Sequence, residues 1–313
     1  MRLLTFNWHE TYLTLLARVG HTWDVVLRPK AGRQDWWAEV RPVPANVILI
    51  DEPTAVAAVE RGVYDAVICH NLLDLGLVVG SGVPTATIFH TSRDLELRHG
   101  LDPAAFERHG LPLVSQTTPV FVSPMKQRSW GLEGVLIPPG VPSDEYGGYT
   151  GELPQVLHVG NLKRELADVN GMSDLQTAVA GLPLTLVGLN PTIPGAELSR
   201  GWDDLKARFR SHRVYIHTAR APFEDGYNLG MLEAMASGMP VVTLAHESSP
   251  IVDGVNGIVG DTSRELSLGL LELLEDPDRA KALGTQARET VRARFSMDSF
   301  IERWKAVLAN ICE

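Results

Sequence analysis

Short apolar segments alternate with predicted helices along most of this 313-residue chain, and this alternation is the strongest constraint on its fold. The apolar segments of the first half show little internal alternation of polar and apolar residues, and most are followed by a helix. Such segments are typical of parallel strands that are covered on both faces of a sheet. The predicted strands lie at residues 2–7, 23–27, 47–50, 65–71, 85–90 and 119–123. This half therefore predicts a doubly wound α/β domain.

A second strand–helix series follows residues 143–151, which are rich in glycine, tyrosine and acidic residues and form the best candidate linker. Its predicted strands lie at residues 155–160, 182–187, 213–217, 241–244 and 257–259, and its late helices at 265–275, 277–294 and 298–311. We predict two Rossmann-like domains, residues 1–147 and 148–296. A closing helix at residues 297–313 is predicted to return to the first domain.

Residues 221–243, APFEDGYNLGMLEAMASGMPVVT, predict a loop, a short helix, a tight turn and a buried strand. Asp225 and Asn228 are both candidate caps for the start of the helix. Gly238 is expected in the left-handed conformation just past its end, and Pro240 prevents its continuation. The segment therefore predicts a complete helix with signals at both ends.

The start of this predicted helix is suited to a phosphate group. Backbone N–H groups around Leu229 and Gly230 precede the first helical hydrogen bond, and a helix start with a glycine is a ready anion site. Asp225 and Glu233 flank it, and carboxylates suit sugar hydroxyls rather than phosphate. The combination predicts a nucleotide-diphosphate sugar as ligand.

Composition excludes several other classes of protein. A net charge of −10 argues against broad nucleic-acid binding, and two cysteines are too few for a disulfide framework or a zinc site. No apolar stretch approaches the ~20 residues that span a bilayer. We expect a cytoplasmic location, with peripheral association with a membrane left open.

The same residues carry a resemblance to a known family. Asp225 to Glu233 and the following Ala-Met-Ala-Ser-Gly-Met-Pro-Val-Val run resemble the C-terminal signature of retaining glycosyltransferases of the GT-B fold, in particular the large family four, or group 1. Residues 253–257 and 135–141 are similar to two further elements of that family, and residues 82–90 more faintly to a third. The resemblance covers residues ~150 to 295 well and the first half loosely.

The resemblance implies two Rossmann-like domains facing a cleft and a UDP- or GDP-linked sugar donor. It implies hexosyl transfer with retention to an acceptor hydroxyl, of a saccharide or a lipid-linked molecule, without a metal or other cofactor. In this family Glu233 would take the ribose hydroxyls and Asp225 the donor sugar. Asn228, Leu229 and Gly230 would offer N–H groups to the distal phosphate. His90 would lie beside the donor sugar, so His90 and Asp225 are the catalytic candidates.

Three positions depart from the family pattern. Asp225 stands where a glutamate is usual, with Glu224 beside it as a second candidate for donor binding. Asn161 replaces an arginine, and Lys163 and Arg164 follow it as candidates for neutralising the diphosphate. The usual glycine pair after the first strand is replaced by residues 7–10, which suggests unusual acceptor recognition.

Each candidate also has a purely structural interpretation. Asp225 and Glu233 could be solvated acids stabilised by the helix dipole, Lys163 and Arg164 a solvated basic pair, and His90 a hydrogen-bonded structural residue. The one Asp-x-Asp triplet, at residues 276–278, is better explained as a helix cap with proline at the first helical position than as a metal site. Two other functions stay open: a nucleotide-sugar epimerase or hydrolase, and a non-catalytic binding module.

Overall fold

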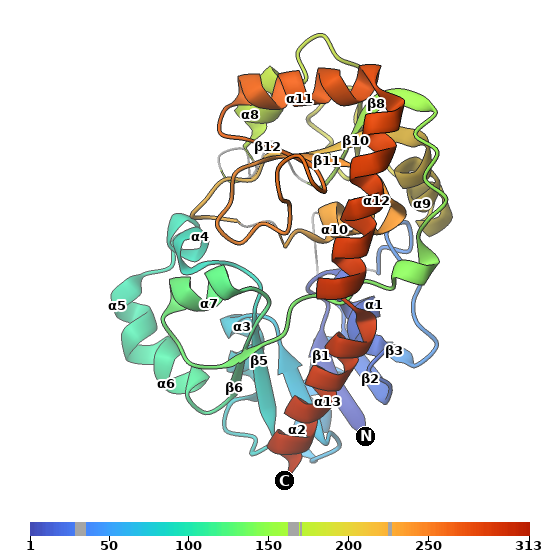
Figure 1. Cartoon of the computed structure of the whole chain (residues 1–313). Coiled ribbons are helices and arrows are strands. Elements are labelled where there is room, and N and C mark those ends of the chain that lie inside the picture. Colours follow the sequence, from blue (N-terminus) through green and yellow to red (C-terminus); the bar gives the residue numbers. More distant parts are fainter. Residues whose placement is uncertain (29–35, 162–168, 170, 225–226) are drawn as a thin grey trace. The chain divides into compact units, whose positions relative to one another are not determined.

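The computed structural model describes residues 1–28, 36–161, 169, 171–224 and 227–313, and the chain divides into two compact units (Figure 1). Unit 1 consists of Met1–Gly140 and Asp298–Glu313, and unit 2 of Val141–Met297. The sequence predicted the boundary at residue 147, within the linker, whereas the contacts place it after Gly140. Each unit is a parallel sheet with helices on both faces, as predicted.

Unit 1 contains a seven-stranded parallel sheet of order β3-β2-β1-β4-β5-β6-β7. Its strands are β1 (Arg2–Phe6), β2 (Thr22–Val26), β3 (Val47–Ile50), β4 (Ala66–Cys69), β5 (Thr85–Phe89), β6 (Thr118–Phe121) and β7 (Val135–Leu136). The order reverses between β1 and β4, and open α/β sheets bind ligands beyond the carboxyl ends of the strands at such a switch point.

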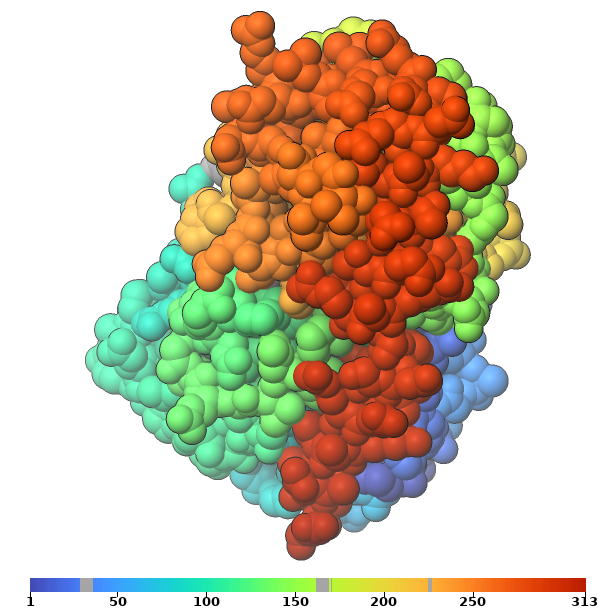
Figure 2. Space-filling model, in the orientation of Figure 1, coloured from blue at the N-terminus to red at the C-terminus, as the bar shows by residue number. Residues whose placement is uncertain are grey.

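Helices cover both faces of this sheet (Figure 1). They are α1 (Glu10–Ala17), α2 (Glu52–Glu60), α3 (Leu72–Val78), α4 (Arg93–Arg98), α5 (Pro103–Ala105), the π-helical turn η1 (Phe106–Gly110), α6 (Leu111–Val114), α7 (Pro124–Trp130) and α13 (Met297–Cys312). The closing helix α13 buries Phe300, Trp304, Val307 and Leu308 in unit 1 and exposes Glu302, Arg303 and Lys305, so its outer face forms part of the surface in Figure 2.

Unit 2 contains a five-stranded parallel sheet of order β12-β11-β10-β8-β9. Its strands are β8 (Leu153–Val159), β9 (Leu184–Val187), β10 (His212–His217), β11 (Val241–Leu244) and β12 (Ile258–Gly260). Its helices are the 3-10 turn η2 (Ser143–Glu145), α8 (Met172–Ala178), α9 (Trp202–Ser211), α10 (Leu229–Ser237), α11 (Ser263–Glu275) and α12 (Pro277–Arg294). The switch point of this sheet lies between β8 and β10.

Most predicted strands and helices are present, with small shifts at their ends. Trp36 and Trp37 are buried, and the indole N–H of Trp36 donates to the carbonyl oxygen of Arg41 at 2.6 Å. Asp276 caps α12 by accepting from the N–H of Arg279 at 2.9 Å, which confirms its structural interpretation. In the described part of the chain, no helix is both long and apolar enough to cross a bilayer.

Candidate functional site

Helix α10 starts at the switch point of unit 2. A Cβ added at Gly230 would lie 3.0 Å from the Tyr215 hydroxyl of β10 and 3.7 Å from Cβ of Val159, the last residue of β8. The glycine therefore permits the first turn of α10 to approach the carboxyl ends of the two strands between which the strand order reverses. This is where an open parallel sheet binds its ligand.

The ends of α10 follow the sequence prediction. Asn228 is the N-cap, and its side-chain oxygen accepts from the N–H of Met231 at 3.2 Å. The first helical hydrogen bond runs from the N–H of Leu232 to the carbonyl of Asn228, so the N–H groups of Leu229 and Gly230 precede it. Gly238 ends the helix with φ +89°, as expected. Together with the helix dipole, these N–H groups form an anion-binding start.

Glu233 lies on the next turn of α10 and is only 6% exposed. Burial and then the negative charge of Glu233 raise the pKa of Tyr215, whose hydroxyl donates to the carbonyl of Val159 at 3.3 Å. Glu233 is therefore an inward-facing acid near the switch point rather than a solvated surface residue, as its alternative interpretation required.

Asn161 links the loops that follow β8 and β9. Its side-chain oxygen accepts from the N–H of Leu189 at 2.8 Å, and the side chain of Asn190 donates to the carbonyl of Gly160 at 2.7 Å. Between these loops Gly188 has φ +135°, and a Cβ there would overlap the carbonyl of Gly160. The structure thus gives Asn161 a role in shaping the edge of the site; its predicted contact with the donor stays a prediction.

Three predicted residues, Asp225, Lys163 and Arg164, lie outside the described residues. Glu224 is described: it is half-buried, and its N–H donates to the carbonyl of Arg220 at 3.1 Å, in the loop that leads from β10 to α10. It therefore stands on the correct side of the sheet for a contact with a ligand at the start of α10.

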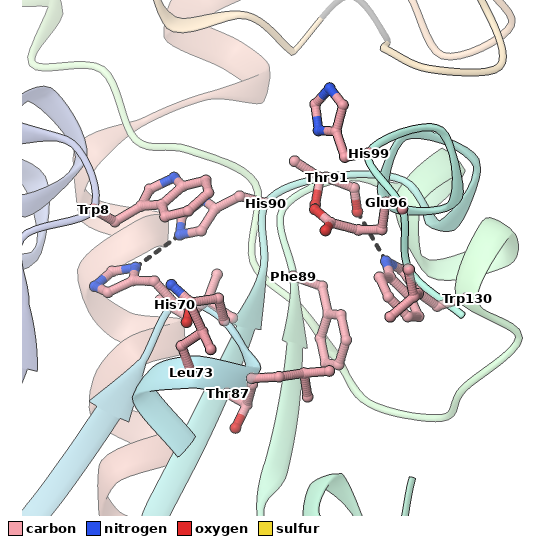
Figure 3. Close-up of a pocket in the computed structure, with 15 residues that line it drawn as sticks. Trp8, His70, Leu73, Thr87, Phe89, His90, Thr91, Glu96, His99 and Trp130 are labelled. Carbon is pink, nitrogen blue, oxygen red and sulfur yellow. Dashed lines mark hydrogen bonds between the residues drawn. The ribbon is translucent and has the colours of Figure 1, made fainter. Parts of the chain in front are cut away.

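A second candidate site lies at the carboxyl ends of the unit 1 strands. His90, directly after β5, forms a hydrogen bond of 2.8 Å through Nε2 to Nδ1 of His70, which follows β4 (Figure 3). Trp8, from the loop after β1, stacks on His90 with ring centroids 5.6 Å apart and an interplanar angle of 13°. Trp8 thus occupies the loop in which the family has its glycine pair.

These residues line a cavity of about 410 Å³ within unit 1. Its walls are mostly apolar and include Leu72, Leu73, Phe89, Leu101 and Trp130, while Thr91, Glu96 and His99 add polar groups (Figure 3). Thr87 lines the cavity, and its buried hydroxyl has no hydrogen-bond partner among the described residues. Such a cavity suits a small organic molecule that carries both apolar and polar groups.

The sequence identified His90 but not the residues that position it. Trp8 and His70 contact it directly; Trp8 follows the predicted strand 2–7, and His70 is the penultimate residue of the predicted strand 65–71. Polar or aromatic residues at strand ends were therefore the available signal, and the pairing of strands decides which of them meet.

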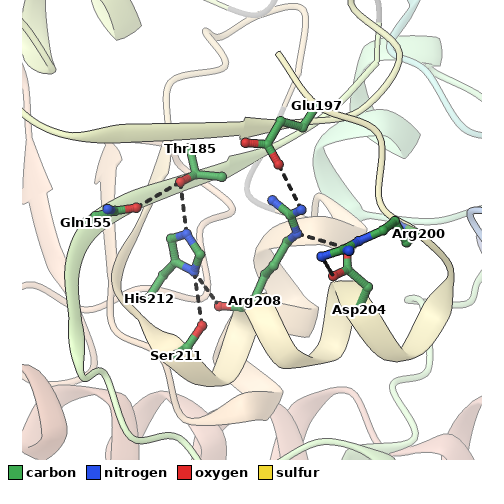
Figure 4. Close-up of polar contacts among 8 residues, drawn as sticks. All are labelled: Gln155, Thr185, Glu197, Arg200, Asp204, Arg208, Ser211 and His212. Atoms are coloured by element: carbon green, nitrogen blue, oxygen red, sulfur yellow. Dashed lines mark hydrogen bonds and ion pairs between the residues drawn. The ribbon is translucent and has the colours of Figure 1, made fainter. Parts of the chain in front are cut away.

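A polar cluster in unit 2 joins α9 to the first residues of β9 and β10 (Figure 4). His212, the first residue of β10, contacts Thr185 at 2.9 Å and the carbonyl of Arg208 at 3.0 Å, and burial lowers its pKa. Arg208 pairs with Glu197 at 2.8 Å and Asp204 at 3.0 Å. We interpret this cluster as structural.

The fold is that of GT-B glycosyltransferases. The structure aligns with the crystal structure of Anabaena Alr3699/HepE in complex with UDP and glucose with a TM-score of 0.75, over 99% of each chain and at 16% identity. Residues 198–290, which include α9, β10, α10 and β11, match the family described as glycosyl transferases group 1. This match supports the group 1 assignment of the chain.

Curated relatives match short segments of the chain. The trehalose synthase of Pyrococcus horikoshii is 32% identical over 89 residues, which are 28% of this chain and 21% of that protein. A GDP-mannose-dependent monoacylated α-(1-6)-phosphatidylinositol monomannoside mannosyltransferase of Corynebacterium glutamicum is 35% identical over 89 residues, which are 28% and 23%. The matched segment thus spans less than a quarter of the length of these relatives.

Proposed function

We propose that this protein is a glycosyltransferase that moves a hexosyl group from a UDP- or GDP-linked sugar to an acceptor hydroxyl, with retention and without a metal ion. The observation that carries the proposal is the start of α10. There, the N–H groups at the start of the helix, the N-cap Asn228 and the inward-facing Glu233 lie near the carboxyl ends of β8 and β10. A diphosphate at the N–H groups and ribose hydroxyls at Glu233 satisfy both features.

Two observations on related proteins support this donor class. One structure with the same fold holds UDP and glucose, and one relative in sequence is named as GDP-mannose-dependent. Within the proposal, Lys163 and Arg164 stabilise the leaving diphosphate, and positioning with charge stabilisation supplies most of the rate. The cap role of Asp276 supports metal independence, because the single Asp-x-Asp triplet is thereby explained structurally.

The acceptor hydroxyl is proposed to bind at the unit 1 cavity, where His90 stands at the end of β5. A saccharide and a lipid-linked molecule are both candidate acceptors, since the cavity has apolar walls and polar groups. We propose a cytoplasmic location, with peripheral association with a membrane as an open alternative.

Binding is the first test. A thermal-shift panel of nucleoside diphosphates should raise the Tm with UDP or GDP, because a ligand that binds only the native state stabilises it. Glu233→Gln should abolish this shift while the protein stays folded, and Glu302→Gln, at an exposed position of α13, should retain it.

Activity is the second test, with a labelled sugar donor in the presence of EDTA. Transfer to an added acceptor in wild type, lost in Glu233→Gln, is the expected result. Full transfer by Glu233→Gln contradicts the assignment. Donor hydrolysis or epimerisation without transfer indicates the first alternative function, and nucleotide binding without turnover indicates a binding module.

A further inference from the structure

Three polar side chains form a hydrogen-bonded row beside the unit 1 switch point. Thr5 lies on β1 and contacts Nε2 of His70 through Oγ1 at 2.8 Å, and Nδ1 of His70 contacts Nε2 of His90 at 2.8 Å. Thr5 also donates to the carbonyl oxygen of Ile68, its neighbour on β4, at 2.9 Å. The row therefore begins at a backbone carbonyl and ends at the cavity.

Aromatic rings hold the two imidazoles in place. Tyr12 packs edge-on against His70 and His90, with centroid distances of 6.1 and 4.7 Å, and Trp8 stacks on His90. The histidine rings are themselves nearly parallel, at 20°, with centroids 5.1 Å apart. Rotation of either ring would break both the packing and the row of hydrogen bonds.

The carbonyl oxygen of Ile68, at one end of the row, determines which atom carries the proton in each hydrogen bond. A carbonyl oxygen can only accept, so the Thr5 hydroxyl gives its single proton to Ile68, and its oxygen accepts from Nε2–H of His70. A neutral His70 protonated at Nε2 has a lone pair on Nδ1, which accepts from Nε2–H of His90. A neutral His90 protonated at Nε2 then carries its lone pair on Nδ1.

The two rings cannot both carry a charge. His70 is only 3% exposed, and two adjacent imidazolium ions at this separation would repel each other. Burial holds the pKa of His90 well below its usual value, and repulsion from Lys126, from His9 and from His70 whenever that ring is protonated lowers it further. Neutral rings are the condition for the assignment of protons above.

We propose that Nδ1 of His90 is a site that accepts the hydrogen bond of an alcohol hydroxyl, and that Thr5 and His70 are positioning residues that fix the tautomer required for it. A weakly basic imidazole accepts a hydrogen bond from a hydroxyl, and so orients it, without removing the hydroxyl proton. Only the origin of that hydroxyl, from the donor sugar or the acceptor, rests on the proposed function.

The tautomer is tested by ¹⁵N NMR of the full chain labelled at histidine, with His90→Gln to assign the signals. We expect His90 protonated at Nε2 in wild type and in Thr5→Ser, which keeps the hydroxyl. In Thr5→Val we expect a mixture of tautomers, because His70 loses its fixed acceptor. Thr87→Val is the matched control and should leave the His90 signal unchanged, because Thr87 is a buried threonine of β5 whose hydroxyl bonds to none of the described residues.

This measurement is independent of activity, so it separates the proposal from the proposed function. The positioning role is overturned if wild-type His90 is protonated at Nδ1, or if Thr5→Val keeps the wild-type tautomer.

Kinetics test the hydroxyl. We expect Thr5→Val to lower the catalytic efficiency about tenfold, the effect of one hydrogen bond, and Thr5→Ser to restore it. A raised KM for the acceptor alone assigns the hydroxyl to the acceptor, and a parallel loss in donor hydrolysis assigns it to the donor sugar. Unchanged kinetics in a Thr5→Val protein with an altered tautomer would overturn the hydroxyl-accepting site. If the protein has no measurable turnover, the same site is tested by titrating UDP-glucose and an alcohol into the NMR sample. In that case, a His90 Nδ1 signal that neither compound shifts would also overturn it.

Discussion

Gly284 in α12 lies directly against the backbone of Gly238, the residue that ends α10. A Cβ added at Gly284 would overlap the carbonyl oxygen of Gly238 and lie 3.2 Å from Cδ of Pro240. Helix α12 therefore packs backbone to backbone on the turn between α10 and β11. Because α10 begins at the candidate donor site, this contact fixes the far end of the helix that presents its N–H groups.

We predict that Gly284→Ala destabilises the protein by about 1–3 kcal/mol, the usual cost of inserting a methyl group into a filled space. Urea unfolding measures the change. Gly76→Ala in α3 is the control, since a Cβ there meets no atom within 4 Å and alanine favours the helix. Equal stability of the two variants would contradict the close approach.

Asn228→Ala should destabilise unit 2 by about 1 kcal/mol, because α10 loses its N-cap. Asn228→Ser should keep most of the stability, since a serine hydroxyl also caps. We expect the two variants to differ in UDP or GDP affinity in the same order, measured by calorimetry. A full loss of stability in both would show that Asn228 has a role besides the cap.

Two substitutions separate the contribution of Asn161 to stability from its electrostatic effect on nucleotide affinity. Asn161→Asp keeps an oxygen that accepts from Leu189 but adds a negative charge, so stability should be retained while the affinity for UDP or GDP falls about tenfold. Asn161→Ala should lower stability by about 1 kcal/mol. Unchanged affinity in Asn161→Asp would place the diphosphate away from this loop.

Asp74 in α3 predicts a pH dependence of folding. Its carboxylate accepts from the N–H of His70 at 2.8 Å and pairs with Arg28 at 2.9 Å, yet burial dominates and raises its pKa to about 6. The folded state then binds more protons than the unfolded state between pH ~4 and 6, so this group lowers the free energy of unfolding as pH rises through that range, by ~3 kcal/mol in all.

Chemical denaturation at several pH values measures this slope, which Asp74→Asn should remove. Asp51, the N-cap of α2, is the contrast. Its hydrogen bonds to Thr54 lower its pKa, so it stabilises at neutral pH and loses that contribution as pH falls. Asp51→Asn should therefore change the pH profile with the opposite sign. If the wild type, Asp74→Asn and Asp51→Asn had the same dependence of stability on pH, the pKa shifts assigned to Asp74 and Asp51 would be contradicted.

The sequence predicts best where signals are local. Helix α10 has a cap residue at one end and Gly238 with Pro240 at the other, and the structure follows both. Helix α7 carried the same signals, Ser123 as cap, Pro124 and a left-handed Gly131, but the strand prediction extended over its cap. Helix α9 begins at Trp202 after the N-cap Gly201, which has no side chain to cap it, and gave no such signal.

The candidate sites were predictable only in part, because they depend on the pairing of strands. His90 was found as a single residue at the end of a predicted strand, whereas Thr5 and His70 meet it through the register that sets Thr5 beside Ile68. The link from Asn161 to Leu189 likewise needs β8 and β9 to be neighbours. Periodicity predicts that strands exist, and it does not predict which loops they bring together.

Helix α13 has a consequence for the synthesis of the chain. Unit 1 begins at Met1 but takes Phe300 and Trp304 of α13 into its core, so its sequence is interrupted by the whole of unit 2. On the ribosome, the strands of unit 1 emerge before α13, with the whole of Val141–Met297 between them. The core of unit 1 can therefore be completed only after unit 2 has been synthesised.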